Sequence, residues 1–111
     1  MKEIKAFIHR NRVADVVHAL EAVGLCGADC NLSVIDVKGT LEALDNRERD
    51  YSLELGGTVI TEVKLELVLP DEQVGQAVAL IREHGRTGQP HAGWVFVSSI
   101  DESWRIDEAE D

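Results

Sequence analysis

The chain has 111 residues, with 11 lysines and arginines against 21 aspartates and glutamates, so its formal charge at pH 7 is −10. That length fits one small domain with a core of its own, and 44% hydrophobic residues is ordinary for a globular protein. Because nucleic-acid binding needs a basic surface, the acidic balance argues against such a partner. No run approaches the ~20 apolar residues of a membrane span, and no apolar signal core follows Met1, so we expect a cytoplasmic protein without membrane insertion.

The first half of the chain carries a strand, helix, strand pattern. Residues 3–8 alternate as a strand does, and residues 13–23 place valines and leucines at helical spacing after Asn11, which suits an N-cap. Gly24 suits a left-handed helix end. A β-rich run then covers residues 32–37, where adjacent Val34 and Ile35 break the alternation and indicate a bulge.

The second half repeats this pattern. Residues 58–69 alternate most clearly, and their polar positions, which include Glu62 and Glu66, are expected to face solvent. A second helix opens at Pro70 and stops at Gly85, and a final strand covers residues 94–100. The doubled pattern predicts an α+β ferredoxin-like plait (βαββαβ), in which an antiparallel four-stranded sheet carries both helices on one face.

Two segments fall outside these elements. Residues 40–57 are irregular, and a loop of that length in a small domain is usually functional. After the last strand the chain is rich in carboxylates. We therefore predict one domain over residues 1–106, with a long loop at 40–57 and an acidic mobile tail at 107–111.

Catalytic and metal-binding patterns are weak. Ser98 and Ser99 lie inside a strand with no local base, so we expect no enzyme activity. Cys26 and Cys30 fit structural thiols best, because cysteine packs as a small hydrophobe, but a disulfide or a soft-metal site stays open. The metal site would add histidines from neighbouring segments: His9, His84 or His91. Of these, His91 is the one placed for a ligand.

Several turns combine glycine with a basic residue, as anion sites do. They are Lys38-Gly39, Arg86-Thr87-Gly88 with Gly93, and Arg105 in the tail. Glycine lets backbone N–H groups approach a phosphate, and lysine or arginine supplies charge. Turn geometry alone also explains these glycines, so spacing by itself leaves phosphate binding open.

The order of three motifs resembles the PII signal-transduction protein superfamily. They are Val37-Lys38-Gly39, Val63-Lys64-Leu65-Glu66-Leu67-Val68, and Thr87-Gly88 followed by Gly93 and Phe96-Val97. The resemblance covers nearly the whole chain and implies a homotrimer with a nucleotide in each cleft between subunits. It also implies that residues 40–57 are the T-loop, which reaches out to partner proteins. The nucleotide-binding residues it implies are Ser33, in place of a threonine, with Gly39, Val68, Thr87, Gly88, His91, Gly93 and Arg105.

Departures from the family pattern narrow the expected ligand. Trp94 stands where ATP-binding members carry a phosphate-binding lysine, and Asp107 replaces the second arginine of the tail. Because an extra anion repels a triphosphate, AMP or ADP is favoured over ATP as the regulatory ligand, with no cofactor. In the loop, Glu42 and Ala43 replace the arginine and glutamine used in 2-oxoglutarate sensing, and Glu62 replaces its lysine, so that sensing is not expected. Tyr51 also lacks the sequence context of a modified tyrosine.

Three functions remain open. The first is a PII-like trimeric regulator that senses an adenine nucleotide or small anion and controls a transporter or enzyme through residues 40–57. The second is a metal-responsive protein, similar to PII and CutA proteins and linked to metal efflux or tolerance, which rests on Cys26, Cys30 and the histidines. The third is a structural trimer with unused clefts, which predicts no ligand at all.

Overall fold

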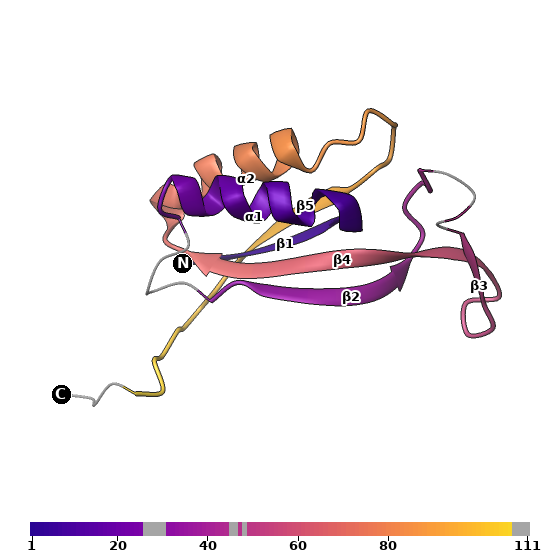
Figure 1. The fold of residues 1–111 in the computed structure, drawn as a ribbon. Helices are drawn as coiled ribbons and strands as arrows, with labels where there is room; N and C mark the ends of the chain where they lie inside the picture. The colour runs from indigo at the N-terminus through magenta and orange to yellow at the C-terminus, as the bar shows by residue number, and fades with distance from the viewer. Residues whose placement is uncertain (26–30, 45–46, 48, 108–111) are drawn as a thin grey trace.

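The computed structural model describes residues 1–25, 31–44, 47 and 49–107. Its elements run from strand to helix and back in the order that the sequence predicts, with an additional short strand (Figure 1). They are β1 (Lys2–His9), the 3₁₀ helix η1 (Arg10–Arg12), α1 (Val13–Ala22), β2 (Ser33–Gly39), β3 (Asp50–Ser52), β4 (Gly57–Leu69), α2 (Asp71–His84) and β5 (Trp94–Ser99).

The strands form one antiparallel sheet in the order β2-β4-β1-β5. Both helices lie on the same face of this sheet (Figure 1). The predicted ferredoxin-like α+β fold is therefore confirmed. The fifth strand, β3, pairs with the beginning of β4, from Asp50 opposite Val59 to Ser52 opposite Gly57.

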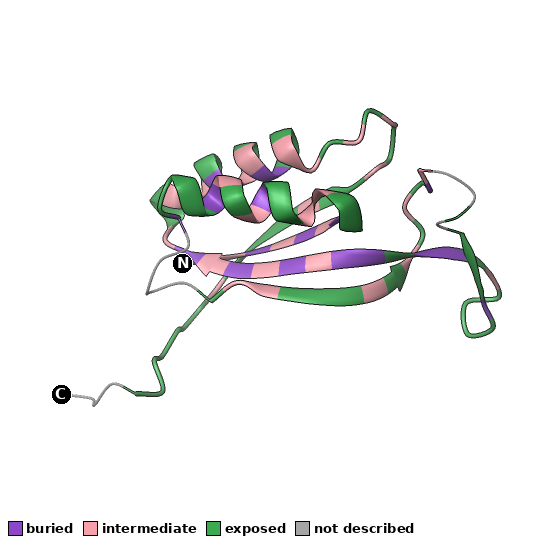
Figure 2. Ribbon diagram, viewed as in Figure 1, coloured by how far each residue is buried: buried purple, intermediate pink, exposed green. Residues whose placement is uncertain are grey.

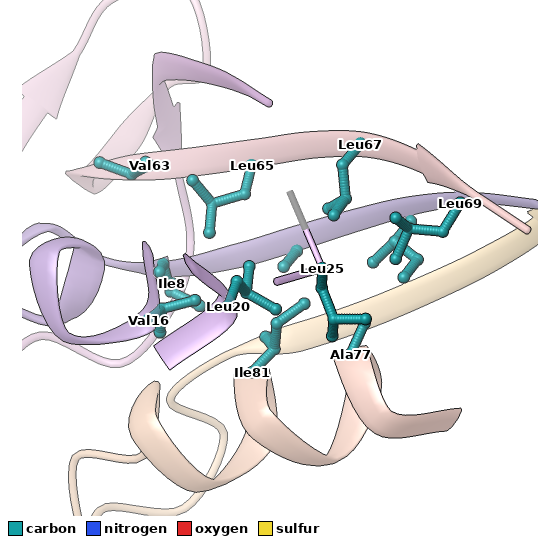
Figure 3. Close-up of a cluster of buried hydrophobic side chains, with 12 residues drawn as sticks. Ile8, Val16, Leu20, Leu25, Val63, Leu65, Leu67, Leu69, Ala77 and Ile81 are labelled. Atoms are coloured by element: carbon teal, nitrogen blue, oxygen red, sulfur yellow. The ribbon is translucent and has the colours of Figure 1, made fainter. Parts of the chain in front are cut away.

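The core lies between the sheet and the two helices. In β1 and β4 every second residue points into it, and in α1 and α2 the buried residues recur every four positions (Figures 2 and 3). The buried residues of this cluster are Ile4, Ala6, Ile8, Val16, Leu20, Leu25, Val63, Leu65, Leu67, Leu69, Ala77 and Ile81. The other face of the sheet carries the remaining side chains of the strands, and no helix of the described residues covers it (Figure 1).

Two local predictions in the first half are wrong. Asn11 is not the cap of α1, because it lies inside η1 and Arg12 occupies the N-cap position. The bulge at Val34 and Ile35 is also absent, since β2 pairs with β4 residue by residue from Ser33 to Gly39. β2 is an edge strand, so both apolar residues remain partly exposed in the single chain, one on each face. Gly24 does adopt the predicted left-handed conformation, with a φ of 73°.

The 40–57 segment is more ordered near its end than the sequence predicts. β3 and the start of β4 form a hairpin that extends beyond the helices (Figure 1). The backbone N–H of Gly56 donates to the carbonyl of Ser52 over 2.8 Å, and the N–H of Leu55 donates to the Ser52 hydroxyl over 3.2 Å. Gly56 has a φ of 68°, which a side chain would oppose. The hairpin turn is therefore a defined structure.

After β5 the chain leaves the sheet and runs away from the helices (Figure 1). The N–H of Ile100 still donates to the carbonyl of Met1 over 3.1 Å, and Trp104 and Ile106 are then exposed. Of the predicted acidic tail, residues 108–111 lie outside the described residues. In the described part of the chain, no helix has the length and apolarity needed to cross a bilayer.

Candidate functional site

A groove of about 450 Å³ lies where the residues after β5 pass the start of β2 and the end of β4. Three predicted nucleotide-binding residues line this tail groove: Ser33, Val68 and Arg105. The sheet brings them together, because Ser33 is paired with Glu66 on β4, two residues before Val68. The remaining lining residues are Met1, Glu3, Asn31, Glu66, Leu67, Ile100, Glu102, Ser103 and Trp104.

The tail groove is mostly acidic. Glu3, Glu66 and Glu102 line it, and Arg105 is the one lysine or arginine among the described residues that line it. The Arg105 guanidinium is held by Asp107, with Nε 3.3 Å from Oδ1 and Nη2 3.4 Å from Oδ2. An anion that reaches Arg105 must therefore compete with this carboxylate.

The segment from Gly85 to Gly93 borders a second cavity of about 400 Å³, here called the loop pocket. Thr87 and Gly93 line it, and the Thr87 hydroxyl accepts a hydrogen bond from the N–H of Gln89 over 3.3 Å. Gly88 and His91 shape the segment with positive φ values of 88° and 54°, but they do not line the pocket. A side chain at Gly93 would meet the backbone carbonyl of Phe7 at 2.9 Å, so this position requires glycine.

The base of the 40–57 segment is fixed by Glu62. This side chain is only 4% exposed, and its Oε2 accepts a hydrogen bond from the N–H of Leu41 over 2.8 Å. The predicted solvent exposure of Glu62 is therefore wrong. The alternation of β4 does place Glu62 on the face away from the helices, but the chain after Gly39 folds over it, and periodicity carries no signal for such a contact.

A further backbone contact joins this base to the loop pocket. The N–H of Glu42 donates to the carbonyl of His91 over 3.4 Å. Gly39, Thr87, Gly88, His91 and Gly93 thus belong to one end of the sheet, and Ser33, Val68 and Arg105 to the other. Ser33 and Gly39 are the two ends of β2, which puts about 20 Å between the groups. A single chain does not unite the eight predicted residues in one pocket.

Aromatic rings gather beside the loop pocket on the open face of the sheet. Trp94 stacks on Phe96 with ring centroids 5.7 Å apart and an interplanar angle of 8°, and Phe7 meets Phe96 edge-on at 6.0 Å. Trp94 lines the pocket and is 57% exposed. Trp94 thus replaces the lysine of ATP-binding relatives with a large apolar side chain.

The described residues offer no set of ligands for the alternative function, a metal-responsive protein. Within them, no group of three or more histidine, cysteine, aspartate or glutamate side chains is placed to hold a metal ion. Cys26 and Cys30, on which the alternative rests, lie outside the described residues. Of the histidines, His9 is fully buried.

Comparison with known proteins identifies the family. The family model described as nitrogen regulatory protein P-II matches residues 1–110. A nitrogen regulatory protein P-II of Rhodobacter capsulatus is 36% identical over 110 residues, which cover 99% of this chain and 95% of the relative. Nitrogen regulatory protein P-II 1 of Methanothermobacter thermautotrophicus is 33% identical over 110 residues, which cover 99% of this chain and 92% of the relative. This chain belongs to the nitrogen regulatory protein P-II family, whose members are regulatory signalling proteins.

Proposed function

We propose that this protein is a trimeric P-II-type regulator. In this proposal it senses an adenine nucleotide, AMP or ADP in preference to ATP, in clefts between its copies. It then controls a transporter or an enzyme through residues 40–57. The family membership supports the regulatory role, and the positions and charges of the residues in the two cavities support the ligand and the mode of binding.

The observation that carries the proposal is the division of the predicted site between the two ends of β2. Ser33, Val68 and Arg105 line the tail groove, whereas Gly39 and the 85–93 residues lie at the opposite end of the sheet. A ligand that uses both groups needs the tail groove of one copy to face the loop end of another. Clefts between copies meet this requirement.

The tail groove offers suitable groups for a purine base. The Ser33 hydroxyl can donate or accept, and the Glu66 carboxylate can accept from an exocyclic amine. The Trp104 ring, which is 70% exposed, offers a face on which a base can stack. In this arrangement the base lies in the tail groove and the phosphates extend toward the glycines of the neighbouring copy.

Charge favours the nucleotides with fewer phosphates. Asp107 competes with a phosphate for Arg105, and Glu102 adds a further negative charge to the tail groove.

The end of the 40–57 segment supports a role in partner binding. The hairpin turn presents Leu53 with 87% of its surface exposed, and Tyr51 and Leu55 are exposed beside it. Apolar side chains held out by a hydrogen-bonded turn gain free energy when a partner covers them. We therefore assign the contact with the regulated protein to this tip.

The test is calorimetric titration of AMP, ADP and ATP into the full chain, with its trimeric state measured by light scattering. We expect AMP or ADP to bind more tightly than ATP. Arg105→Ala should weaken binding by about 1.5–3 kcal/mol, because a charge-assisted hydrogen bond to phosphate is lost. Arg10→Ala is the control, since Arg10 pairs with Asp36 at 2.8 Å and lines neither site. Tighter binding of ATP, or no heat with any nucleotide, would contradict the proposal.

A further inference from the structure

The loop pocket has the form of a small-molecule site within one chain. Its floor is apolar and consists of Ile8, Val78, Ile81 and Val95, contributed by β1, α2 and β5. Its volume of about 400 Å³ falls in the usual range for ligand pockets, roughly 300–1,000 Å³. The tail groove, by contrast, lies at the other end of the sheet and shares no lining residue with it.

The rim of the loop pocket carries unbalanced positive charge. Arg82 and Arg86 line it, and no aspartate or glutamate among the residues that the structure describes does so. Neither arginine makes an ion pair with any residue that the structure describes. Two guanidinium groups beside an apolar floor match an organic anion, because arginine binds carboxylates with two parallel hydrogen bonds.

Gln89 provides a second and independent observation. Its side-chain Oε1 is buried and finds no hydrogen-bond donor in the described part of the chain. Gln89 also lines the loop pocket. A buried acceptor without a donor is costly, so a ligand hydroxyl or N–H group that reaches Oε1 would be favoured.

We propose that the loop pocket binds a small organic monoanion, a carboxylate that combines an apolar body with a hydroxyl or N–H donor. The carboxylate pairs with Arg82 and Arg86, the apolar body covers Ile81 and its neighbours, and the donor reaches Gln89. A single negative charge fits best, because the chain carries −10 overall and the carbonyl end of α2 adds negative potential nearby.

Binding at this pocket has a route to the 40–57 segment. The carbonyl of His91, which lies between the lining residues Gln89 and Gly93, accepts a hydrogen bond from the N–H of Glu42. Any effect of the monoanion on partner binding rests on the proposed function. The binding site itself does not, because one chain supplies all of it.

The probe is 2-hydroxy-4-methylpentanoate, which carries a carboxylate, a hydroxyl and a branched apolar body. Its binding is followed by tryptophan fluorescence in the Trp104→Phe variant of the full chain, where Trp94 in the pocket wall is the remaining tryptophan. We expect a saturable change in the Trp94 signal. The neutral 2-hydroxy-4-methylpentanamide and the hydroxyl-free 4-methylpentanoate should each bind about tenfold more weakly, since one lacks the charge and the other the donor.

Variants then separate this site from the tail groove. In the Trp104→Phe background, Arg82→Gln and Arg86→Gln should each weaken probe binding about tenfold, and both side chains are exposed, so the fold is not at risk. Arg10→Gln is the matched control. Arg105→Gln should leave probe binding unchanged while it weakens AMP binding in the chain that retains Trp104.

Three results would overturn the monoanion site. They are equal binding of the neutral amide, a loss of probe binding with Arg105→Gln, or no saturation at millimolar probe. If AMP binding depends on Arg105 and the probe does not bind, the proposed function stands and this inference fails. If the probe binds and no nucleotide does, the reverse holds.

Discussion

The carboxylate of Glu62 occupies the space in which a side chain at Gly39 would stand. Glycine at the end of β2 therefore allows a buried carboxylate to reach the backbone N–H of Leu41, the second residue after the strand. The hydrogen bond links the rigid sheet to the first turn of the 40–57 segment. The conformation of that segment thus depends on two positions that contribute nothing to its tip.

Gly39→Ala tests this dependence. The added methyl group should displace the Glu62 side chain and break its hydrogen bond to Leu41, at a cost of about 1–3 kcal/mol in the free energy of unfolding. Chemical denaturation measures the loss, and amide hydrogen exchange at Leu41 should become faster. Gly57→Ala is the matched control, because nothing lies within 4 Å of a side chain added there. Equal stability of the two variants would contradict the packing argument.

Glu62→Ala and Glu62→Gln separate the hydrogen bond from the charge. Alanine leaves the Leu41 N–H without its acceptor and should destabilise the protein by about 1–3 kcal/mol, with faster exchange at Leu41. Glutamine keeps an acceptor oxygen at the same position and should retain most of the protection. If glutamine loses as much as alanine, the negative charge rather than the hydrogen bond holds the segment.

Periodicity in the sequence predicts the sheet and the helices but not this contact. The apolar residues alternate in β1 and β4 and recur every four positions in α2, because one face of each element is buried. These buried faces make up the observed core. Periodicity does not predict β3, because its three residues are too few to show a period. In β2 the adjacent apolar residues wrongly indicate a bulge, because an edge strand keeps apolar residues half exposed on both faces.

The candidate site is even less accessible to spacing rules. Ser33, Val68 and Arg105 come from three distant segments and meet only because β2 pairs with β4 and the chain after β5 passes both. The resemblance to the family predicts them as members of one nucleotide site, and the fold shows which of the predicted residues share a groove. Spacing indicates only one side of the loop pocket, the turn that carries Arg86, Thr87 and Gly93. Arg82 and Gln89 give no such signal, because the packing of α2 against the 85–93 residues brings them to the pocket.

Asp107→Asn tests the competition for Arg105. Removal of the carboxylate charge weakens the hold on the guanidinium, which lies 3.3 Å from Asp107 through Nε, and frees it for a phosphate. We expect nucleotide affinity to rise about three- to tenfold, with the largest gain for ATP because it carries the most charge. Calorimetry in low and high salt measures the change. Asp101→Asn, which removes an exposed charge outside the groove lining, should have little effect, and an equal gain there would point to net charge alone.

Asp71→Asn tests the ion pair between α2 and the amino terminus. The terminal ammonium of Met1 donates to Asp71 Oδ1 over 2.8 Å, and this hydrogen bond lowers the pKa of Asp71 below its ordinary value. A carboxyl group with a lower pKa in the folded state stabilises the protein above its unfolded pKa of about 3.9, and this contribution is lost as the pH falls through the folded value. The wild type should thus be more stable than Asp71→Asn at pH 7, and the difference should vanish in acid. Denaturation of untagged protein across this range measures it, with Glu72→Gln in the same helical turn as the control.

Gly75→Ala should stabilise the protein by about 0.5–1 kcal/mol. Gly75 lies inside α2, its φ is not positive, and nothing is within 4 Å of a side chain added there. Alanine then lowers the entropy of the unfolded chain and favours the helix without steric cost. Gly24→Ala is the opposite case, because no atom of the described residues lies within 4 Å of a side chain added there but its φ of 73° opposes one, so about 1 kcal/mol should be lost. Thermal denaturation of both variants decides between backbone conformation and available space, and a gain at both positions would show that space alone controls the outcome.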